Sequence, residues 1–383
     1  MRQNSIKSLF VSFTIAVTSQ AYAHKTTPLV DGNEERPKVQ LAILLDTSGS
    51  MNGLIDQAKT QLWKIVNSFA KVKKNDKVPE IYVALYEYGN SGINLQEQYV
   101  RQLSPLTDEL DVISEKLFSL KTNGGSEFCG AAIKKSLEEL KWDSSSDVYK
   151  AIFIAGNEPF TQGPVSSTES CQRAIQAGIV VNAIHCGAEA QGINGGWKAG
   201  AIAAEGDFLI IDQDKAVVHI QAPQDKIIIE LSKKLNKTYI PYGTRGAEMS
   251  LNQELQDSNA LKNAKSGAPL SRALTKGGLA YTNSGWDLVD LSNNKPEDFE
   301  KLEKSALPTE MVGMTLEEVK EHVAQKNRDR KQIQAQINTL NKEREAYVSK
   351  EKAALNQEDD TLGQAITKAV YSQVLKNGFQ ITQ

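Results

Sequence analysis

The sequence predicts a doubly wound α/β fold, in which helices cover both faces of a mostly parallel sheet. Two observations support this prediction. Short apolar runs recur between residues 39 and 216, and segments with apolar residues at three- and four-residue spacing separate them. Most runs are almost continuous in apolar residues, as expected for strands of a parallel sheet, because both of their faces are buried. Strand–helix alternation of this kind is typical of α/β domains.

The predicted elements follow one another along the chain. The strands are expected at 39–45, 81–86, 149–154, 179–184 and 208–211. The helices are expected at 54–69, 108–117, 130–140, 170–177 and 224–235. Residues 238–243 are expected to form the last edge of this domain. The domain is therefore predicted to extend from residue 38 to residue 243. In such a fold, ligands bind beyond the carboxyl ends of the strands.

The first 23 residues have the pattern of a secretory signal peptide. Arg2 and Lys7 are basic, residues 9–17 are apolar, and Ala21-Tyr22-Ala23 fits a small-residue cleavage site. The apolar stretch is too short to cross a bilayer comfortably, and no later segment approaches the required length. We therefore expect a bacterial periplasmic or secreted protein with no membrane span after cleavage. Its mature chain would begin with a linker at 24–37.

The sequence changes character beyond residue 243. Periodicity fades between 244 and 310, where Gly, Ser, Asn and Lys are frequent, so this region is predicted to be an irregular connection. Residues 311–383 are predicted to be helical. A capping box at Thr315-Leu-Glu-Glu318 opens a long amphipathic helix, and a second helix begins at Thr361. Because three cations interrupt the seven-residue frame of the long helix, a helical hairpin is favoured over a dimeric coiled coil.

Charge and composition narrow the functional classes. Removal of the leader takes away two cations and no acid, so the formal net charge moves from -3 to -5. Basic residues are nowhere concentrated enough to predict binding to nucleic acid or to an anionic membrane surface. No CxxC pair occurs and the four histidines are scattered, so a zinc site of the Cys/His type has no support.

Three cysteines remain in the mature chain: Cys129, Cys171 and Cys186. Export permits a disulfide, and the odd number leaves one thiol over. Cys171 opens a predicted helix and Cys186 ends the next strand, so a bridge between them would brace the carboxyl edge of the sheet. Cys129 lies near the same edge, so a Cys129–Cys171 pair stays open as the alternative.

A polar motif follows the first apolar run. Asp46, Ser48 and Ser50 alternate in the loop after this predicted strand. A carboxylate and small hydroxyls suit a hard cation such as Mg²⁺, which prefers oxygen ligands and keeps several waters. Mn²⁺ or Ca²⁺ would use the same donors. Taken alone, a loop of this composition is often a simple turn with a helix cap.

A second loop makes the Asp-x-Ser-x-Ser motif more specific. Asp-x-Ser-x-Ser after a strand, together with Gly124-Gly125-Ser126 before a helix, resembles the first two parts of a metal-ion-dependent adhesion site (MIDAS). This site belongs to the von Willebrand factor A (VWA) family, and the resemblance covers about residues 38–243. It implies that Asp46, Ser48, Ser50 and Ser126 hold the cation, with Ser126 where the family usually has Thr. The whole chain is also similar to a group of bacterial exported VWA proteins.

The third part of the motif departs from the family pattern. The family has Thr-Asp-Gly after the fourth strand, whereas this chain has Gly156 at the position of the aspartate. Asn157 and Glu158 are weaker candidate ligands from the same loop. The loss of one carboxylate is expected to weaken metal binding, or to leave the partner to supply more of the charge.

The leading hypothesis is an exported, non-enzymatic binding protein that engages a protein partner through this cation, with a partner carboxylate completing its coordination. The alternative is a metal-free envelope scaffold that acts through its C-terminal helices. A third hypothesis is a metal-dependent phosphohydrolase with Asp46 as the phosphoryl-accepting nucleophile. That chemistry needs a second aspartate two residues further on, and Ser48 stands there instead.

Overall fold

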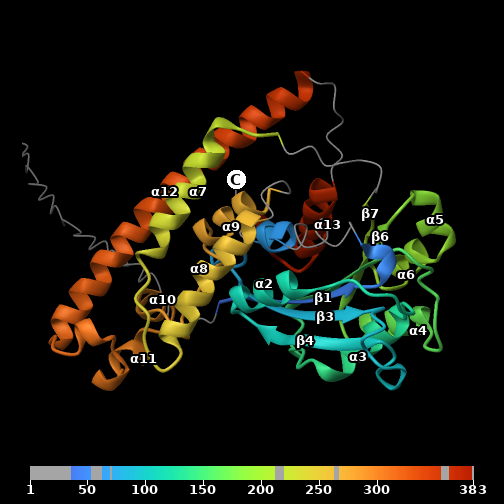
Figure 1. The fold of residues 1–383 in the computed structure, drawn as a ribbon, viewed down its shortest axis with the longest axis horizontal. Helices are drawn as coiled ribbons and strands as arrows, with labels where there is room; N and C mark the ends of the chain where they lie inside the picture. The colour runs from blue at the N-terminus through green and yellow to red at the C-terminus, as the bar shows by residue number, and fades with distance from the viewer. Residues whose placement is uncertain are drawn as a thin grey trace, which may run out of the picture. The chain divides into compact units, whose positions relative to one another are not determined.

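A six-stranded sheet lies at the centre of the computed structural model (Figure 1). In spatial order its strands are β4 (Val100–Thr107), β3 (Glu80–Tyr88), β1 (Lys38–Asp46), β5 (Tyr149–Gly156), β6 (Val180–Cys186) and β7 (Phe208–Ile211). Of these six, β4 alone pairs antiparallel, with β3. The structure describes residues 36–52, 63–69, 71–211, 220–262, 267–354 and 362–381. The predicted signal peptide and most of the linker therefore lie outside the described residues.

The predicted doubly wound α/β fold is confirmed. All five predicted strands are present, and β1, β5 and β6 are buried along almost their whole length. Strand β4 was not predicted. Its buried positions are few and are separated by exposed or half-buried residues, so it lacks the continuous apolar run that revealed the other strands.

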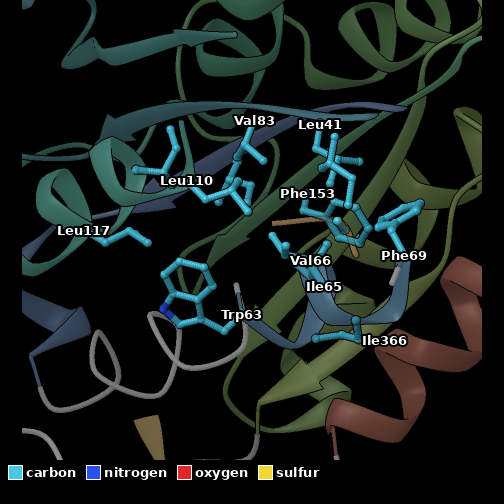
Figure 2. Packing of buried hydrophobic residues seen from close by; sticks show 14 of the residues in the cluster. Leu41, Trp63, Ile65, Val66, Phe69, Val83, Leu110, Leu117, Phe153 and Ile366 are labelled. Atoms are coloured by element: carbon cyan, nitrogen blue, oxygen red, sulfur yellow. The ribbon is translucent and has the colours of Figure 1, made fainter. Parts of the chain in front are cut away.

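Each face of the sheet has its own hydrophobic core, because successive side chains of a strand point to opposite faces. Ala42 and Leu44 of β1 pack with α3 (Cys129–Glu139), α4 (Ser167–Gln176) and α6 (Trp197–Ala203). Leu41 and Ile43 pack on the other face with residues 63–69, α2 (Leu110–Ser119) and α13 (Leu362–Lys376). Figure 2 shows this second core, where Leu41, Phe153 and Ile366 lie close to the helix of residues 63–69.

The last helix packs on the sheet, which corrects the expected helical hairpin. Ile366, Val370 and Val374 of α13 are fully buried in the core of the second face. The chain then ends in β8 (Gln380–Ile381), which pairs antiparallel with β2 (Val72–Lys73). The apolar face of α13 is therefore buried against the sheet. The long helix α12 (Leu316–Ala354) instead packs on α7 (Pro223–Asn236), and a cleft separates it from α13 in the described residues.

The described part of residues 244–310 includes four α-helices, which corrects the expected irregular connection. They are α8 (Gly246–Lys262), α9 (Ala268–Gly277), α10 (Leu288–Asn294) and α11 (Pro296–Glu300). Polar residues occupy inward positions of these helices: Gln253 and Gln256 on α8, and Arg272 and Lys276 on α9, are all buried. Hydrophobic periodicity could not reveal helices whose buried faces are partly polar.

The predicted capping box opens α12. The hydroxyl of Thr315 accepts a hydrogen bond from the backbone N–H of Glu318, and the Glu318 carboxylate accepts one from the N–H of Thr315. Further along, Arg330 is buried and donates to Asp287 and Asp290, at 2.7 Å in each case. Arg330 of the polar seam is therefore used for contacts within the chain, and α12 lies along α7 (Figure 1). Within the described ranges, no helix is long and apolar enough to cross a membrane.

Candidate metal centre

Strand β1 ends at Asp46, whose side chain is fully buried at the carboxyl edge of the sheet. Its Oδ1 atom accepts a 2.8 Å hydrogen bond from the backbone N–H of Ser48. Its Oδ2 atom has no hydrogen-bond partner. Burial raises the pKa of Asp46 to about 7, although hydrogen bonds from Ser48 oppose the shift. A buried carboxylate oxygen without a partner is unfavourable, so it points to a ligand that supplies positive charge.

The two predicted serines lie beside this carboxylate. The hydroxyls of Ser48 and Ser50 are 2.8 Å apart, and Ser50 donates a 3.0 Å hydrogen bond to Oδ1 of Asn157. Ser48 is buried, whereas Ser50 is exposed at the mouth of the site. The structure therefore brings together Asp46, Ser48, Ser50 and the weaker candidate Asn157, from the loops that follow β1 and β5.

A second carboxylate reaches the site from the loop before α3. Glu127 is only 6% exposed. Burial raises the pKa of Glu127, and the nearby Ser48 side chain opposes this rise. The charge of Glu127 in turn adds to the burial that raises the pKa of Asp46. Glu127 was not predicted as a site residue, because the motif pointed only to the hydroxyl of Ser126. The available signal was an acidic residue directly after the Gly-Gly-Ser loop.

Gly89, directly after β3, leaves room for the two carboxylates. Gly89 has φ +78, and a Cβ at this position would lie 2.6 Å from Asp46 Oδ1 and 2.9 Å from Glu127 Cγ. Both acidic side chains therefore flank the same glycine. Any other residue at position 89 would meet them and would also adopt an unfavourable backbone conformation.

The loop that carries Ser126 lies at the same edge of the sheet. The backbone N–H of Asn123 donates to the carbonyl of Thr47 at 2.9 Å, and Gly125 packs directly against the Gly89 carbonyl. Ser126 is half-buried in this loop. Among the described hydrogen bonds, none joins its hydroxyl to Asp46, Ser48 or Ser50. The structure thus places Ser126 near the site, and its role as a ligand stays a prediction.

The departure at Gly156 has a structural reason. A Cβ at Gly156 would lie 2.4 Å from the Tyr88 hydroxyl and 3.1 Å from the Trp197 ring. Both aromatic residues are fully buried, and Tyr88 donates a 2.9 Å hydrogen bond to the Ala155 carbonyl. They fill the space that an aspartate side chain would need. Trp197 also donates to the backbone carbonyl of Glu158 at 2.8 Å, which fixes the loop after β5.

The expected disulfide is not formed, because Cys129, Cys171 and Cys186 are buried thiols that are not bridged to one another. Cys171 belongs to the core on one face of the sheet and Cys186 to the core on the other, so strand alternation separates them. The alternative pair, Cys129 and Cys171, shares one core but is not bonded. Burial raises the pKa of all three thiols, as expected for inert packing residues.

The donor set fits a hard cation. Among the described residues, no group of three or more His, Cys, Asp or Glu side chains gathers at one point. The site instead combines the carboxylates of Asp46 and Glu127 with the hydroxyls of Ser48 and Ser50. Mg²⁺ is usually held by one or two carboxylates together with waters, so these residues match its requirements.

A comparison of the sequence with family models matches the part of the chain that carries this site. Residues 40–199 match the model of the von Willebrand factor type A domain. The chain contains a VWA domain. The matched range includes all the predicted ligands of the site. It ends before β7 and before the helices α7 to α13.

Several solved structures are similar to part of this chain. The SpRpn10 VWA domain is 17% identical, with a TM-score of 0.37, over 47% of this chain and 91% of that chain. Proximal thread matrix protein 1 from the mussel byssus, with a zinc-occupied MIDAS motif, is 16% identical with a TM-score of 0.35, over 47% of this chain and 43% of that chain. BatB from Bacteroides thetaiotaomicron is 18% identical with a TM-score of 0.34, over 45% and 90%. Comparison with curated protein sequences gave no match.

Proposed function

We propose that this protein binds a protein partner through a divalent cation held at the carboxyl edge of its VWA sheet. The observation that supports the proposal is Oδ2 of Asp46, a buried carboxylate oxygen with no partner beside two serine hydroxyls. Asp46, Ser48 and Ser50 would hold the cation, with Ser126 and Asn157 as the additional candidates from neighbouring loops. We further propose that the protein is exported, because residues 1–23 have the pattern of a signal peptide.

The bound cation would act as a Lewis acid toward an oxygen of the partner. Mg²⁺ is the first candidate, and Mn²⁺ or Ca²⁺ would use the same donors. Ser50 lies at the exposed mouth of the site, so the partner would approach from this side and offer a carboxylate. The chain's own groups would orient the cation: the Ser48 backbone N–H holds Asp46, and Asn157 holds the Ser50 hydroxyl.

The alternative is a metal-free scaffold that acts through its C-terminal helices. Helix α13 is packed on the sheet, and the buried Arg330 fixes α12 to α10. The apolar face of α13 is therefore used inside the chain, whereas α12 buries only Val319, Val323, Arg330 and Ile337 and keeps most of its surface exposed. The unpartnered carboxylate oxygen of Asp46 favours the cation site as the point of partner contact.

The proposal is tested by capture of partners from a cell-envelope extract on the immobilised mature chain, residues 24–383. We expect retained proteins to depend on Mg²⁺, to be released by a chelator, and to be lost with the Asp46→Asn variant. Asparagine preserves the shape of the side chain and its acceptor for the Ser48 N–H, so the fold should survive the change. Capture that persists both in chelator and with Asp46→Asn would overturn the cation-dependent function and favour the scaffold.

A further inference from the structure

We infer that Glu127 is the second carboxylate ligand of this cation. It would replace the aspartate that the family motif has at position 156. The inference rests on the proposed function, because it concerns the same site. It assigns a role to a residue of the second loop that the motif does not include.

The third loop cannot supply a carboxylate at the position of Gly156. Tyr88 and Trp197 occupy the space into which a side chain at 156 would point. A single carboxylate, Asp46, leaves the charge of a divalent cation half compensated. A second carboxylate beside the first would neutralise it, and the second loop carries one at Glu127.

The position of Glu127 suits this role. The residue is more than nine-tenths buried. A Cβ at Gly89 would lie 2.6 Å from Asp46 Oδ1 and 2.9 Å from Glu127 Cγ, so both acidic side chains pass close to this glycine. The backbone N–H of Glu127 donates to Oε1 of Gln162 at 2.6 Å, which anchors the loop that presents it.

Two other pairs of acidic residues in this protein differ from Asp46 and Glu127, because each pair contacts an arginine. Asp287 and Asp290 share the guanidinium of Arg330, at 2.7 Å from each carboxylate. In the same way, Arg272 pairs with both Asp111 and Asp257. Among the described residues, no lysine or arginine pairs with either Asp46 or Glu127.

Two buried carboxylates without a cation repel each other and are poorly solvated, so such a pair is unfavourable in the folded protein. The interior of this protein elsewhere places a basic side chain between its acidic ones. At Asp46 and Glu127, an external cation would take the place of that basic side chain.

Glu158 is the competing carboxylate, since it lies close enough to Glu127 to influence its ionisation. Its backbone carbonyl is held by Trp197, and its side chain is half-buried. The atoms nearest to a Cβ on Gly89 belong to Asp46 and Glu127 and do not include Glu158. Glu158 is therefore a matched control: an acidic residue of the same site region that the inference does not make a ligand.

The test compares Glu127→Gln, Glu158→Gln and Asp46→Asn with the wild-type mature chain by Mg²⁺ titration calorimetry and by thermal unfolding with and without Mg²⁺. We expect Glu127→Gln to weaken Mg²⁺ binding by at least about tenfold, which is the lower end of losses seen even for outer-shell changes. We expect Glu158→Gln to weaken it by less than about fivefold, the range of a partly exposed charge. In chelator, Glu127→Gln should unfold at the wild-type temperature or higher, because the change removes carboxylate repulsion.

The outcomes separate the inference from the proposed function. If Asp46→Asn abolishes Mg²⁺ binding while Glu127→Gln binds as tightly as wild type, the role of Glu127 is overturned and the metal site stands. If Glu158→Gln loses more affinity than Glu127→Gln, the carboxylate has been assigned to the wrong residue. If Glu127→Gln unfolds earlier than wild type in chelator, its role is structural and the inference fails. If wild type itself binds no Mg²⁺, the proposed function fails.

Discussion

The hydroxyl of Tyr149 donates a 2.6 Å hydrogen bond to Oε1 of Gln373, and this bond joins the central strand β5 to the last helix of the chain. Both residues are buried, and they are separated by 224 positions in the sequence. The amide of Gln373 also donates to Asn182 on β6 at 2.7 Å. The C-terminal helix is thus part of the core that supports the candidate metal site.

Helix α13 should therefore be necessary for the stability of the whole sheet. We expect Ile366→Ala to lower the free energy of unfolding by about 2–5 kcal/mol, because it removes a fully buried side chain from the core. The control is Leu375→Ala on the same helix, whose side chain is 50% exposed and whose loss should change stability by no more than about 0.5 kcal/mol. Urea unfolding followed by circular dichroism measures both. Equal effects of the two variants would contradict the packing of α13 on the sheet.

Arg330 should be a second point at which the C-terminal region is fixed. It donates to Asp287 and Asp290, and its guanidinium lies 3.9 Å from the centre of the Tyr239 ring. Arg330→Ala leaves two carboxylates buried without their cation, so we expect a loss of about 3–5 kcal/mol in the free energy of unfolding. Arg328→Ala removes an exposed arginine of the same helix and should cost no more than about 1 kcal/mol. A small loss for Arg330→Ala, in the same unfolding experiment, would show that α12 is not held by this contact.

Gly89 should be essential to the site for geometric reasons. A methyl group at this position would lie 2.6 Å from Asp46 Oδ1, and its φ of +78 disfavours any side chain by about 1–2 kcal/mol. We expect Gly89→Ala to lower both the stability and the affinity for Mg²⁺. Gly124→Ala is the control, because a Cβ there meets nothing within 4 Å. Retention of full Mg²⁺ affinity by Gly89→Ala would contradict the close placement of Asp46 and Glu127.

Binding of Mg²⁺ should depend on pH through Asp46. Burial raises the pKa of this carboxyl from 3.8 to about 7, so the folded, metal-free protein holds a proton there more tightly than the unfolded chain does. The contribution of Asp46 to stability is therefore present below pH 4 and is lost as the pH rises through 7. The cation competes with this proton for the carboxylate.

We therefore expect the apparent Mg²⁺ affinity to fall as the pH drops below 7, by up to about tenfold per pH unit, and to level off above it. Calorimetric titrations between pH 5.5 and 8.5 would measure this dependence. An affinity that stays constant across the range would show that Asp46 is not deprotonated on binding.

The sequence predicted those parts of the fold whose physical signal is local. The strands β1, β5 and β6 are buried on both faces and therefore appear as continuous apolar runs. Helices α8 and α9 were not predicted, because their inward faces carry the polar residues Gln253 and Arg272. These residues find their partners only in the folded chain. The attachment of α13 to the sheet also depends on residues far away in sequence, which periodicity cannot identify.

The candidate site, like the fold, was predicted only where its signal is local in the sequence. Asp46, Ser48 and Ser50 share one loop, so their spacing alone indicated oxygen ligands at a strand end. The reason for Gly156 lies in Tyr88 and Trp197, which only the fold brings to it. Glu127 likewise gains its significance from its approach to Asp46 across the sheet edge.

The most direct test of the metal site is anomalous diffraction from crystals of the mature chain grown with Mn²⁺, which uses the same oxygen donors as Mg²⁺ and scatters more strongly. We predict an anomalous peak in contact with the carboxylate of Asp46 and the hydroxyl of Ser48, and no peak there in crystals of Asp46→Asn. The absence of a peak at this edge in the wild type at saturating Mn²⁺, or an undiminished peak in Asp46→Asn, would contradict the account.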